Sequence, residues 1–288
     1  MATFSFEGQK LNYTQHGPRD SARVTILIHG LLLSQKMHRP LAAALAARGN
    51  RVVTIDLLGH GVSERPRDMW RYSMSLFGEQ VVALMDHLEL EQAVVLGTSL
   101  GANTALEVSA RAPERLRGMV IEMPVLDNAL LFAALAFTPL LIATTFGAPL
   151  TRPLARLAAR IPRFGPSWLE QGLDFISQAP GPSSAVIQGI FFGRVAPHRK
   201  ERRTLQTKAL IIGHPRDPVH PFSDAGMLAE ELPNNRLLEA DSIIEMRRHP
   251  ERLTNEIADF IDECWQPRVA RAPRRTRATR AAHKSATS

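Results

Sequence analysis

Residues 97–101, GTSLG, have the types and spacing of a nucleophile site, because they match the pattern G-x-S-x-G. They lie between an apolar run typical of a buried strand, QAVVLG, and an Ala-rich helical run, ANTALEVSARAP. In this context a sharp turn lifts the Ser99 hydroxyl above the edge of a sheet. The N-terminus of the next helix favours a developing anion there, and the backbone N–H of Leu100 can donate to it. We therefore predict that Ser99 attacks a carbonyl carbon.

Strand and helix patterns alternate on both sides of this motif. The predicted strands cover residues 23–30, 50–59, 92–97, 117–125, 208–215 and 235–240, after a short hairpin in the first 17 residues. The predicted helices cover residues 38–50, 73–90, 102–113, 222–232 and 250–265. Such alternation predicts a mostly parallel sheet with helices on both faces.

The alternation stops between residues 127 and 207, where helical runs are separated by prolines and no strand pattern occurs. We predict a helical cap there. Residues 129–146 have no charge and reach the lower length limit of a membrane span, but Pro139 interrupts them. We expect a lid helix that packs on the core or lines an apolar pocket. A membrane span and a lid that also contacts lipid remain as alternatives.

Composition and charge exclude some other classes of protein. The single cysteine, Cys264, excludes a disulfide framework and a Cys-rich metal site, and no His or carboxylate spacing indicates a metal. The first residues lack the pattern of a signal peptide, so we expect a cytoplasmic protein, with a peripheral membrane location as the alternative.

The net charge of +7 comes from residues 267–288, which hold six Arg, one Lys and no acid. Such a segment has too few apolar residues to fold, so we expect a disordered basic tail. It could contact anionic lipid or nucleic acid through charge alone, because no aromatic residue interleaves the arginines.

Residues 1 to about 265 resemble the α/β-hydrolase superfamily. The resemblance rests on GTSLG, on the His29-Gly30 pair after the first buried strand, and on the family's D-x-x-G-x-G-x-S loop, which matches Asp56, Gly59, Gly61 and Ser63. It implies an α/β fold with an eight-stranded, mostly parallel sheet, helices on both faces and a helical cap after the sixth strand. His29 and His60 occupy motif positions that are usually structural.

The resemblance also assigns roles to individual residues. It implies that the backbone N–H of Leu31 is a second oxyanion donor. It places the acid of a catalytic triad after the seventh strand, at Asp217, with Glu122 at the end of the sixth strand as the alternative. A serine in the motif argues against the epoxide hydrolases and haloalkane dehalogenases of this fold, which use an aspartate at that position.

The histidine of the triad does not fall where the resemblance requires it. In the family it follows the eighth strand, about seven residues before a proline that opens the last helix. Here that proline is Pro250, and counting back reaches Ile243. A substitute base must come within about 3 Å of the Ser99 hydroxyl. Three downstream histidines remain as candidates for that base: His220, His249 and His214.

We therefore predict a serine hydrolase of the esterase or lactonase kind, without cofactor or metal, that acts on a small apolar acyl substrate. The alternative is a catalytically impaired homologue that serves as a binding or scaffold protein because Ile243 replaces the base. The predicted domains are a core of residues 1–126 and 208–266, a cap of residues 127–207, and the tail.

Overall fold

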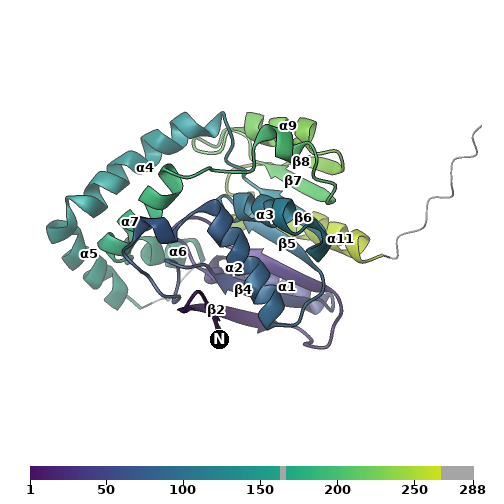
Figure 1. The fold of residues 1–288 in the computed structure, drawn as a ribbon, viewed down its shortest axis with the longest axis horizontal. Helices are drawn as coiled ribbons and strands as arrows, with labels where there is room; N and C mark the ends of the chain where they lie inside the picture. Colours follow the sequence, from purple (N-terminus) through teal and green to yellow (C-terminus); the bar gives the residue numbers. More distant parts are fainter. Residues whose placement is uncertain (163–166, 267–288) are drawn as a thin grey trace, which may run out of the picture.

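The computed structural model describes residues 1–162 and 167–266, so the prediction for residues 267–288 lies outside the described part of the chain. Eight strands form one sheet in the order β1-β2-β4-β3-β5-β6-β7-β8 (Figure 1). The strands are β1 (Ala2–Phe6), β2 (Gln9–His16), β3 (Val24–Ile28), β4 (Arg51–Asp56), β5 (Ala93–Thr98), β6 (Leu116–Glu122), β7 (Ala209–Gly213) and β8 (Asn235–Glu239). Strands β3 to β8 pair in parallel, while β1 with β2 and β2 with β4 pair antiparallel.

Helices cover both faces of this sheet. One face carries α2 (Met74–His87), α3 (Leu100–Arg111) and α9 (Phe222–Glu231), and the other carries α1 (Arg39–Ala47) and α11 (Glu251–Trp265). The short elements are η1 (Gln35–His38), η2 (Met69–Arg71), η3 (Pro113–Arg115) and α10 (Glu245–Arg248).

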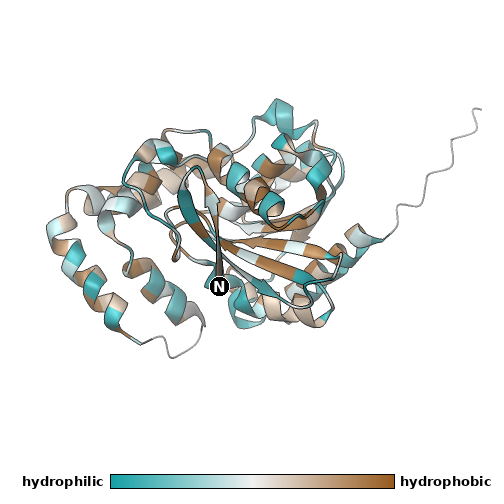
Figure 2. Cartoon of the chain, turned by 60° about the horizontal axis from the view of Figure 1, so that its bottom comes forward, coloured by the Kyte–Doolittle hydropathy of each residue, from teal (hydrophilic) through white to brown (hydrophobic). Residues whose placement is uncertain are grey.

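The apolar core is therefore split into two layers by the sheet. Successive side chains of β3 alternate between them, with Ile26 and Ile28 in the layer under α2 and α3, and Leu27 in the layer under α1 and α11. Every residue of β3, β5 and β7 is buried, as expected for parallel strands covered on both faces. The strands are correspondingly hydrophobic along their length (Figure 2).

A helical cap is inserted between β6 and β7, and no strand occurs in it within the described residues. Its helices are α4 (Ala129–Thr145), α5 (Ala148–Arg160), α6 (Ser167–Ile176), α7 (Pro180–Phe191) and α8 (Arg199–Arg202). Helices α4, α5 and α6 project from one side of the core (Figure 1). Among the described residues, no single helix has the length and apolar composition of a membrane span, although α4 and α5 meet those criteria together and are bent by 98°.

The turn between β5 and α3 depends on close backbone contact. Ser99 has φ 56° and ψ −112°, in the left-handed region that non-glycine residues rarely adopt. A Cβ atom on Gly97 would lie 2.0 Å from the carbonyl carbon of Gly101. A Cβ atom on Gly101 would lie 2.3 Å from the carbonyl oxygen of Ile28. Both glycines of the motif are thus required by packing.

We expect Gly97→Ala to destabilise the fold by about 3 kcal/mol, because the added methyl group meets backbone that cannot move away. Gly226→Ala is the matched control, since a Cβ atom at Gly226 meets nothing within 4 Å in helix α9. That control should stabilise the protein by about 0.5–1 kcal/mol. Urea unfolding of both variants measures the difference. Equal stability of Gly97→Ala and wild type would contradict the close approach.

Candidate active site

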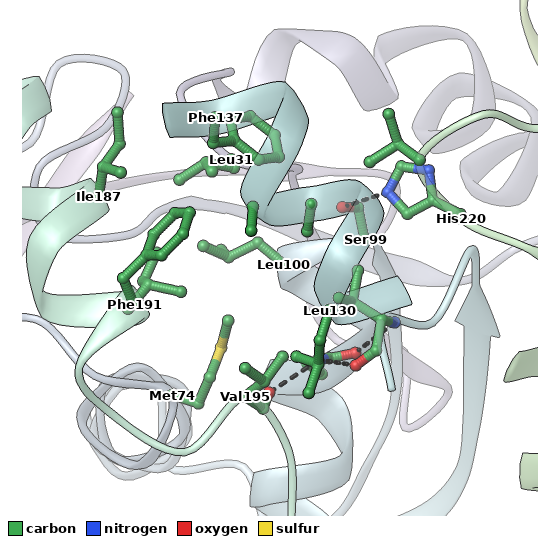
Figure 3. A pocket seen from close by; sticks show the side chains of 16 residues that line it. Leu31, Met74, Ser99, Leu100, Leu130, Phe137, Ile187, Phe191, Val195 and His220 are labelled. Carbon is green, nitrogen blue, oxygen red and sulfur yellow. Dashed lines mark hydrogen bonds between the residues drawn. The ribbon is translucent and has the colours of Figure 1, made fainter. Parts of the chain in front are cut away.

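Three side chains form a hydrogen-bonded line at the carboxyl edge of the sheet. Nε2 of His220 lies 2.8 Å from Oγ of Ser99, and Nδ1 of His220 lies 3.0 Å from Oδ2 of Asp217 (Figure 3 shows the first contact). An ionised carboxylate only accepts hydrogen bonds, so Nδ1 carries a proton and donates. In the neutral ring, Nε2 is then left to accept the proton of the Ser99 hydroxyl. The geometry is that of a nucleophile, a general base and an orienting acid.

One loop after β7 supplies both the histidine and the acid. Oδ1 of Asp217 accepts the backbone N–H groups of Val219, at 2.8 Å, and His220, at 2.9 Å. Burial acts to raise the pKa of Asp217, but the hydrogen bonds and charge of His220 and the two backbone N–H groups outweigh it, so the pKa is lowered. The carboxylate therefore stays ionised and holds its own loop in a tight turn.

The two predicted oxyanion donors lie beside Ser99. Leu31 follows β3 and Leu100 opens α3, and both line the same cavity as Ser99 and His220. Within the described residues, neither backbone N–H donates to a protein acceptor. Two free N–H groups beside a serine hydroxyl are the arrangement that stabilises a tetrahedral oxyanion.

His29 and His60 hold the loop after β4 and do not line the cavity. Nε2 of His29 accepts the N–H of Leu57 at 3.1 Å, while its Nδ1 lies 2.8 Å from the carbonyl oxygen of Gly30. Nδ1 of His60 lies 2.9 Å from the carbonyl oxygen of Leu58. Burial lowers the pKa of both histidines. Each ring is thus neutral and stabilises the loop through hydrogen bonds to its backbone.

Asp56 fastens the other end of that loop. Its carboxylate accepts the backbone N–H of Gln35 at 2.7 Å and that of Val62 at 3.1 Å, and its carbonyl oxygen accepts the Ser63 hydroxyl at 2.6 Å. The first and last residues of the D-x-x-G-x-G-x-S pattern are therefore hydrogen-bonded to each other, and the Asp56 carboxylate holds the backbone at Gln35 and Val62.

A second histidine–carboxylate pair lies buried behind the serine. Nε2 of His214 is 3.2 Å from Oε1 of Glu122, and its Nδ1 is 2.9 Å from the carbonyl oxygen of Ser242. Both partners are acceptors, so the imidazolium form satisfies them best. Glu122 also accepts the Thr98 hydroxyl, and its carbonyl oxygen accepts the N–H of Ser99 at 2.9 Å. The pair thus fixes the backbone on which Ser99 stands.

Charge stabilises this second pair. Burial acts to raise the pKa of Glu122, but His214, Arg247 and Thr98 outweigh it and lower the pKa to about 2. For His214, burial acts to lower the pKa, but the adjacent Glu122 carboxylate, 3.2 Å away, outweighs it and raises the pKa. Glu122, the alternative acid in the sequence-based prediction, does not contact His220 and instead pairs with His214.

The structure separates the three candidate bases. Only His220 reaches Ser99; His214 is held by Glu122, and His249 is exposed at the end of α10. Ile243 is 42% exposed and does not line the cavity. Of the three candidate substitutes for the histidine that the family places after β8, His220 in the loop after β7 is therefore the one that contacts Ser99.

The cavity over Ser99 has a volume of about 260 Å³ and is lined almost entirely by apolar side chains (Figure 3). The core contributes Leu31, Met74, Leu100 and Val125; the cap contributes Leu130, Ala133, Ala134, Phe137, Ile187, Ile190, Phe191 and Val195. As expected, α4 lines an apolar pocket.

Asn103 is a residue of this site that the sequence analysis missed. Its Nδ2 donates to the carbonyl oxygens of Val125 and Val195, each at 2.7 Å, and its Oδ1 accepts the N–H of Val125. It therefore connects α3 to the chain just before the cap and to the loop that follows α7. The sequence signal is its position four residues after Ser99, which puts both on one helix face.

Comparisons with known proteins agree with this fold. A family model described as alpha/beta hydrolase fold matches residues 24–241. The chain is 27% identical over 233 residues to the 2-hydroxymuconate semialdehyde hydrolase of Pseudomonas putida, covering 76% of this chain and 79% of that enzyme. It is 41% identical over 75 residues to the enzyme of that name from Pseudomonas sp. (strain CF600), where the match spans only 26% of either chain.

Solved structures show the same fold. The enol-lactonase from Burkholderia xenovorans LB400 superposes with a TM-score of 0.74 at 23% identity, covering 91% of this chain and 100% of that one. A meta-cleavage product hydrolase from Pseudomonas fluorescens IP01 gives a TM-score of 0.70 at 21% identity, covering 91% and 98%.

We expect Glu122→Gln to destabilise the protein by about 3 kcal/mol near pH 5.5, because it leaves the buried His214 without its counter-charge. The contribution of Glu122, whose pKa falls from 4.5 to about 2, is present above pH 4.5 and is lost as the pH falls toward 2. That of His214, whose pKa is raised above 6.5, is complete below pH 6.5 and is lost at higher pH. The difference between variant and wild type in urea unfolding should therefore be largest between these values. His249→Ala serves as the exposed control, and a pH-independent difference would contradict the ion pair.

Proposed function

The chain belongs to the α/β-hydrolase fold family, and from that premise we propose that it is a serine hydrolase of neutral, apolar esters or lactones. The observation that carries the proposal is the line from Ser99 through His220 to Asp217, with separations of 2.8 and 3.0 Å. A serine alone is a weak nucleophile, and a histidine within hydrogen-bond distance is what activates it.

In the proposed reaction, Oγ of Ser99 attacks the acyl carbon while Nε2 of His220 takes the hydroxyl proton. The resulting oxyanion accepts hydrogen bonds from the N–H groups of Leu31 and Leu100. His220 then gives its proton to the leaving alcohol, and an acyl-serine remains. Water, deprotonated by His220, attacks the acyl carbon; the bond to Oγ of Ser99 breaks, His220 returns the proton to that oxygen, and the acid is released. Asp217 stabilises the imidazolium in both halves of the reaction.

The lining of the cavity supports a neutral substrate. Ser99, Asn103 and His220 are its polar residues, and the amide of Asn103 is already bonded to backbone groups. Among the residues that the structure describes, no Lys or Arg lines the cavity, so a substrate carboxylate would enter an apolar space without a counter-charge, at a cost of several kcal/mol. The likeness to an enol-lactonase agrees with a lactone as one substrate class.

The alternative of an inactive binding protein rests on Ile243 in place of a base after β8. The contact between His220 and Ser99 favours the hydrolase over that alternative, because it supplies a proton acceptor from another loop. A binding protein would have no need of a hydroxyl, an imidazole and a carboxylate in one line.

We expect Ser99→Ala and His220→Ala each to lower the kcat for p-nitrophenyl butyrate by at least about a thousandfold. Ser99→Ala should also abolish labelling by a fluorophosphonate probe. His249→Ala is the matched control and should retain wild-type turnover. Ile243→His should change turnover by less than about twofold, because the base is already present.

Two outcomes would contradict the proposal. Turnover that survives His220→Ala would mean that another group takes the proton. A wild-type chain that neither turns over the ester nor reacts with the probe, while Ile243→His does both, would favour the inactive homologue.

We expect charge on the acyl group to weaken catalysis sharply. The kcat/KM of mono-p-nitrophenyl glutarate should be about a hundredfold or more below that of p-nitrophenyl butyrate, because its carboxylate enters the apolar cavity unpaired. Phe137→Lys, which places a cation on the cavity wall, should reduce the difference in kcat/KM between the two esters. Equal kcat/KM values for the two esters in wild type would sink the assignment of a neutral substrate.

A further inference from the structure

The outer face of helix α4 carries large apolar side chains that nothing in the described structure covers. Leu131, Leu135, Ile142 and Phe146 are 66%, 65%, 54% and 80% exposed. Their spacing of four, seven and four residues places them in one stripe along the helix. The other side of α4 lines the cavity over Ser99, for example with Phe137. The helix is therefore apolar on the side facing solvent as well as on the side facing the cavity.

Helix α5 continues this exposed apolar surface beyond the bend at Gly147. Leu150, Leu154 and Leu157 are 76%, 61% and 61% exposed, and their spacing of four and three residues again defines one stripe. In a helix packed on a globular core, such a stripe faces inward. Here the buried positions of α5 are only Ala155 and Ala158. The leucines of α5 are therefore mostly exposed to solvent, and Leu154 also borders a small cavity with Leu140 and Phe175.

The remaining surface of α5 is basic. Arg152, Arg156 and Arg160 are exposed and follow one another at four-residue spacing, so they form a row on a different side from the leucines. Residues 128–169 contain four arginines and no acid.

Two of these arginines gather around a cavity of about 290 Å³. Arg152 and Arg156 line it together with Arg67 from the loop before η2. None of the three pairs with an acidic side chain among the residues that the structure describes. The outer side of the cap thus presents unneutralised positive charge as well as uncovered apolar area.

We propose that α4 and α5 form a docking surface for an anionic lipid bilayer. A helix with leucines on one side, arginines on another and no acid is the pattern of a helix lying in the membrane interface. The leucines enter the acyl boundary, and the arginines, at the level of the headgroups, pair with lipid phosphates. The bend of 98° between α4 and α5 favours a surface position, because neither helix alone is long enough to span.

Sedimentation of the full-length chain with lipid vesicles tests this directly and needs no turnover, so it stands apart from the proposed hydrolase activity. Vesicles of phosphatidylcholine alone are compared with vesicles containing about one third phosphatidylglycerol. We expect wild type to bind the anionic vesicles preferentially, and less so as salt is added. Leu150→Ser combined with Leu154→Ser should lower the partition coefficient about tenfold or more. Arg152→Glu combined with Arg156→Glu should remove the preference for anionic lipid.

Ile244→Ser and Arg248→Glu are matched controls, because both residues are exposed on the core at α10. They should bind as wild type does. The variant side chains are exposed, so melting temperatures should not fall, and circular dichroism verifies the fold. The basic residues 267–288 are the same in every variant, so any difference between variants comes from the cap.

Three results would overturn the proposal. Wild type that stays in the supernatant with both kinds of vesicle would exclude docking. Equal binding by the cap variants and the controls would assign binding to another part of the chain. A dimer in light scattering that the leucine substitutions dissociate, without vesicle binding, would show that a second copy of the chain covers this surface.

Discussion

The backbone of Ser99 is held in a conformation that costs roughly 1–3 kcal/mol for a non-glycine residue, and the geometry of the site follows from it. Its N–H donates to the carbonyl oxygen of Glu122, and its carbonyl oxygen accepts the N–H of Asn103. These bonds, with the close contacts at Gly97 and Gly101, hold the turn against its own strain. Because the turn is fixed, the hydroxyl of Ser99 stands at one point above the sheet.

Two histidine–carboxylate pairs lie close to Ser99. They differ in the second group that each histidine contacts. His220 contacts a carboxylate on one side and a hydroxyl on the other, so its neutral form satisfies both contacts. His214 contacts a carboxylate and a carbonyl oxygen, which are both acceptors, so its charged form suits both contacts. The first pair faces the cavity, where we propose that it exchanges a proton with the substrate, while the second is buried and supports the end of β6. A histidine and a carboxylate thus form a pair at the cavity and a second, supporting pair behind it, with the two histidines only six positions apart in the sequence.

The cap has an inner surface that faces the cavity and an outer surface that faces solvent. Its inner side closes an apolar cavity over Ser99, where, in the proposed reaction, a low local dielectric would strengthen the hydrogen bonds to the oxyanion. Asn103 hydrogen-bonds the segments before α4 and after α7 to α3, the helix that begins directly after Ser99. Its outer side exposes apolar and basic side chains that do not pack on the core. A helix apolar on both sides is unusual in a monomer, where large exposed apolar patches tend to mark binding surfaces.

The sequence by itself determined the sheet, the cap and the nucleophile turn, because each depends on local patterns. Buried parallel strands need continuous apolar runs, helices need their periodicity, and the turn at Ser99 needs glycines on both sides; all of these are visible within a few residues. Asp217 was predicted to follow β7, and the structure places it in the loop after that strand.

Only the tertiary structure decided which histidine meets Ser99. No sequence pattern distinguishes the three histidines that follow the cap, His214, His220 and His249. Counting back from Pro250 reaches Ile243, which cannot act as a base. The choice depends on the path of the loop after β7, where Asp217 accepts two backbone N–H groups and turns His220 over the serine. That contact joins residues 121 positions apart, so no local pattern records it. Hydrophobic periodicity fixes elements and faces, whereas a hydrogen bond at 2.8 Å depends on how separate loops pack together.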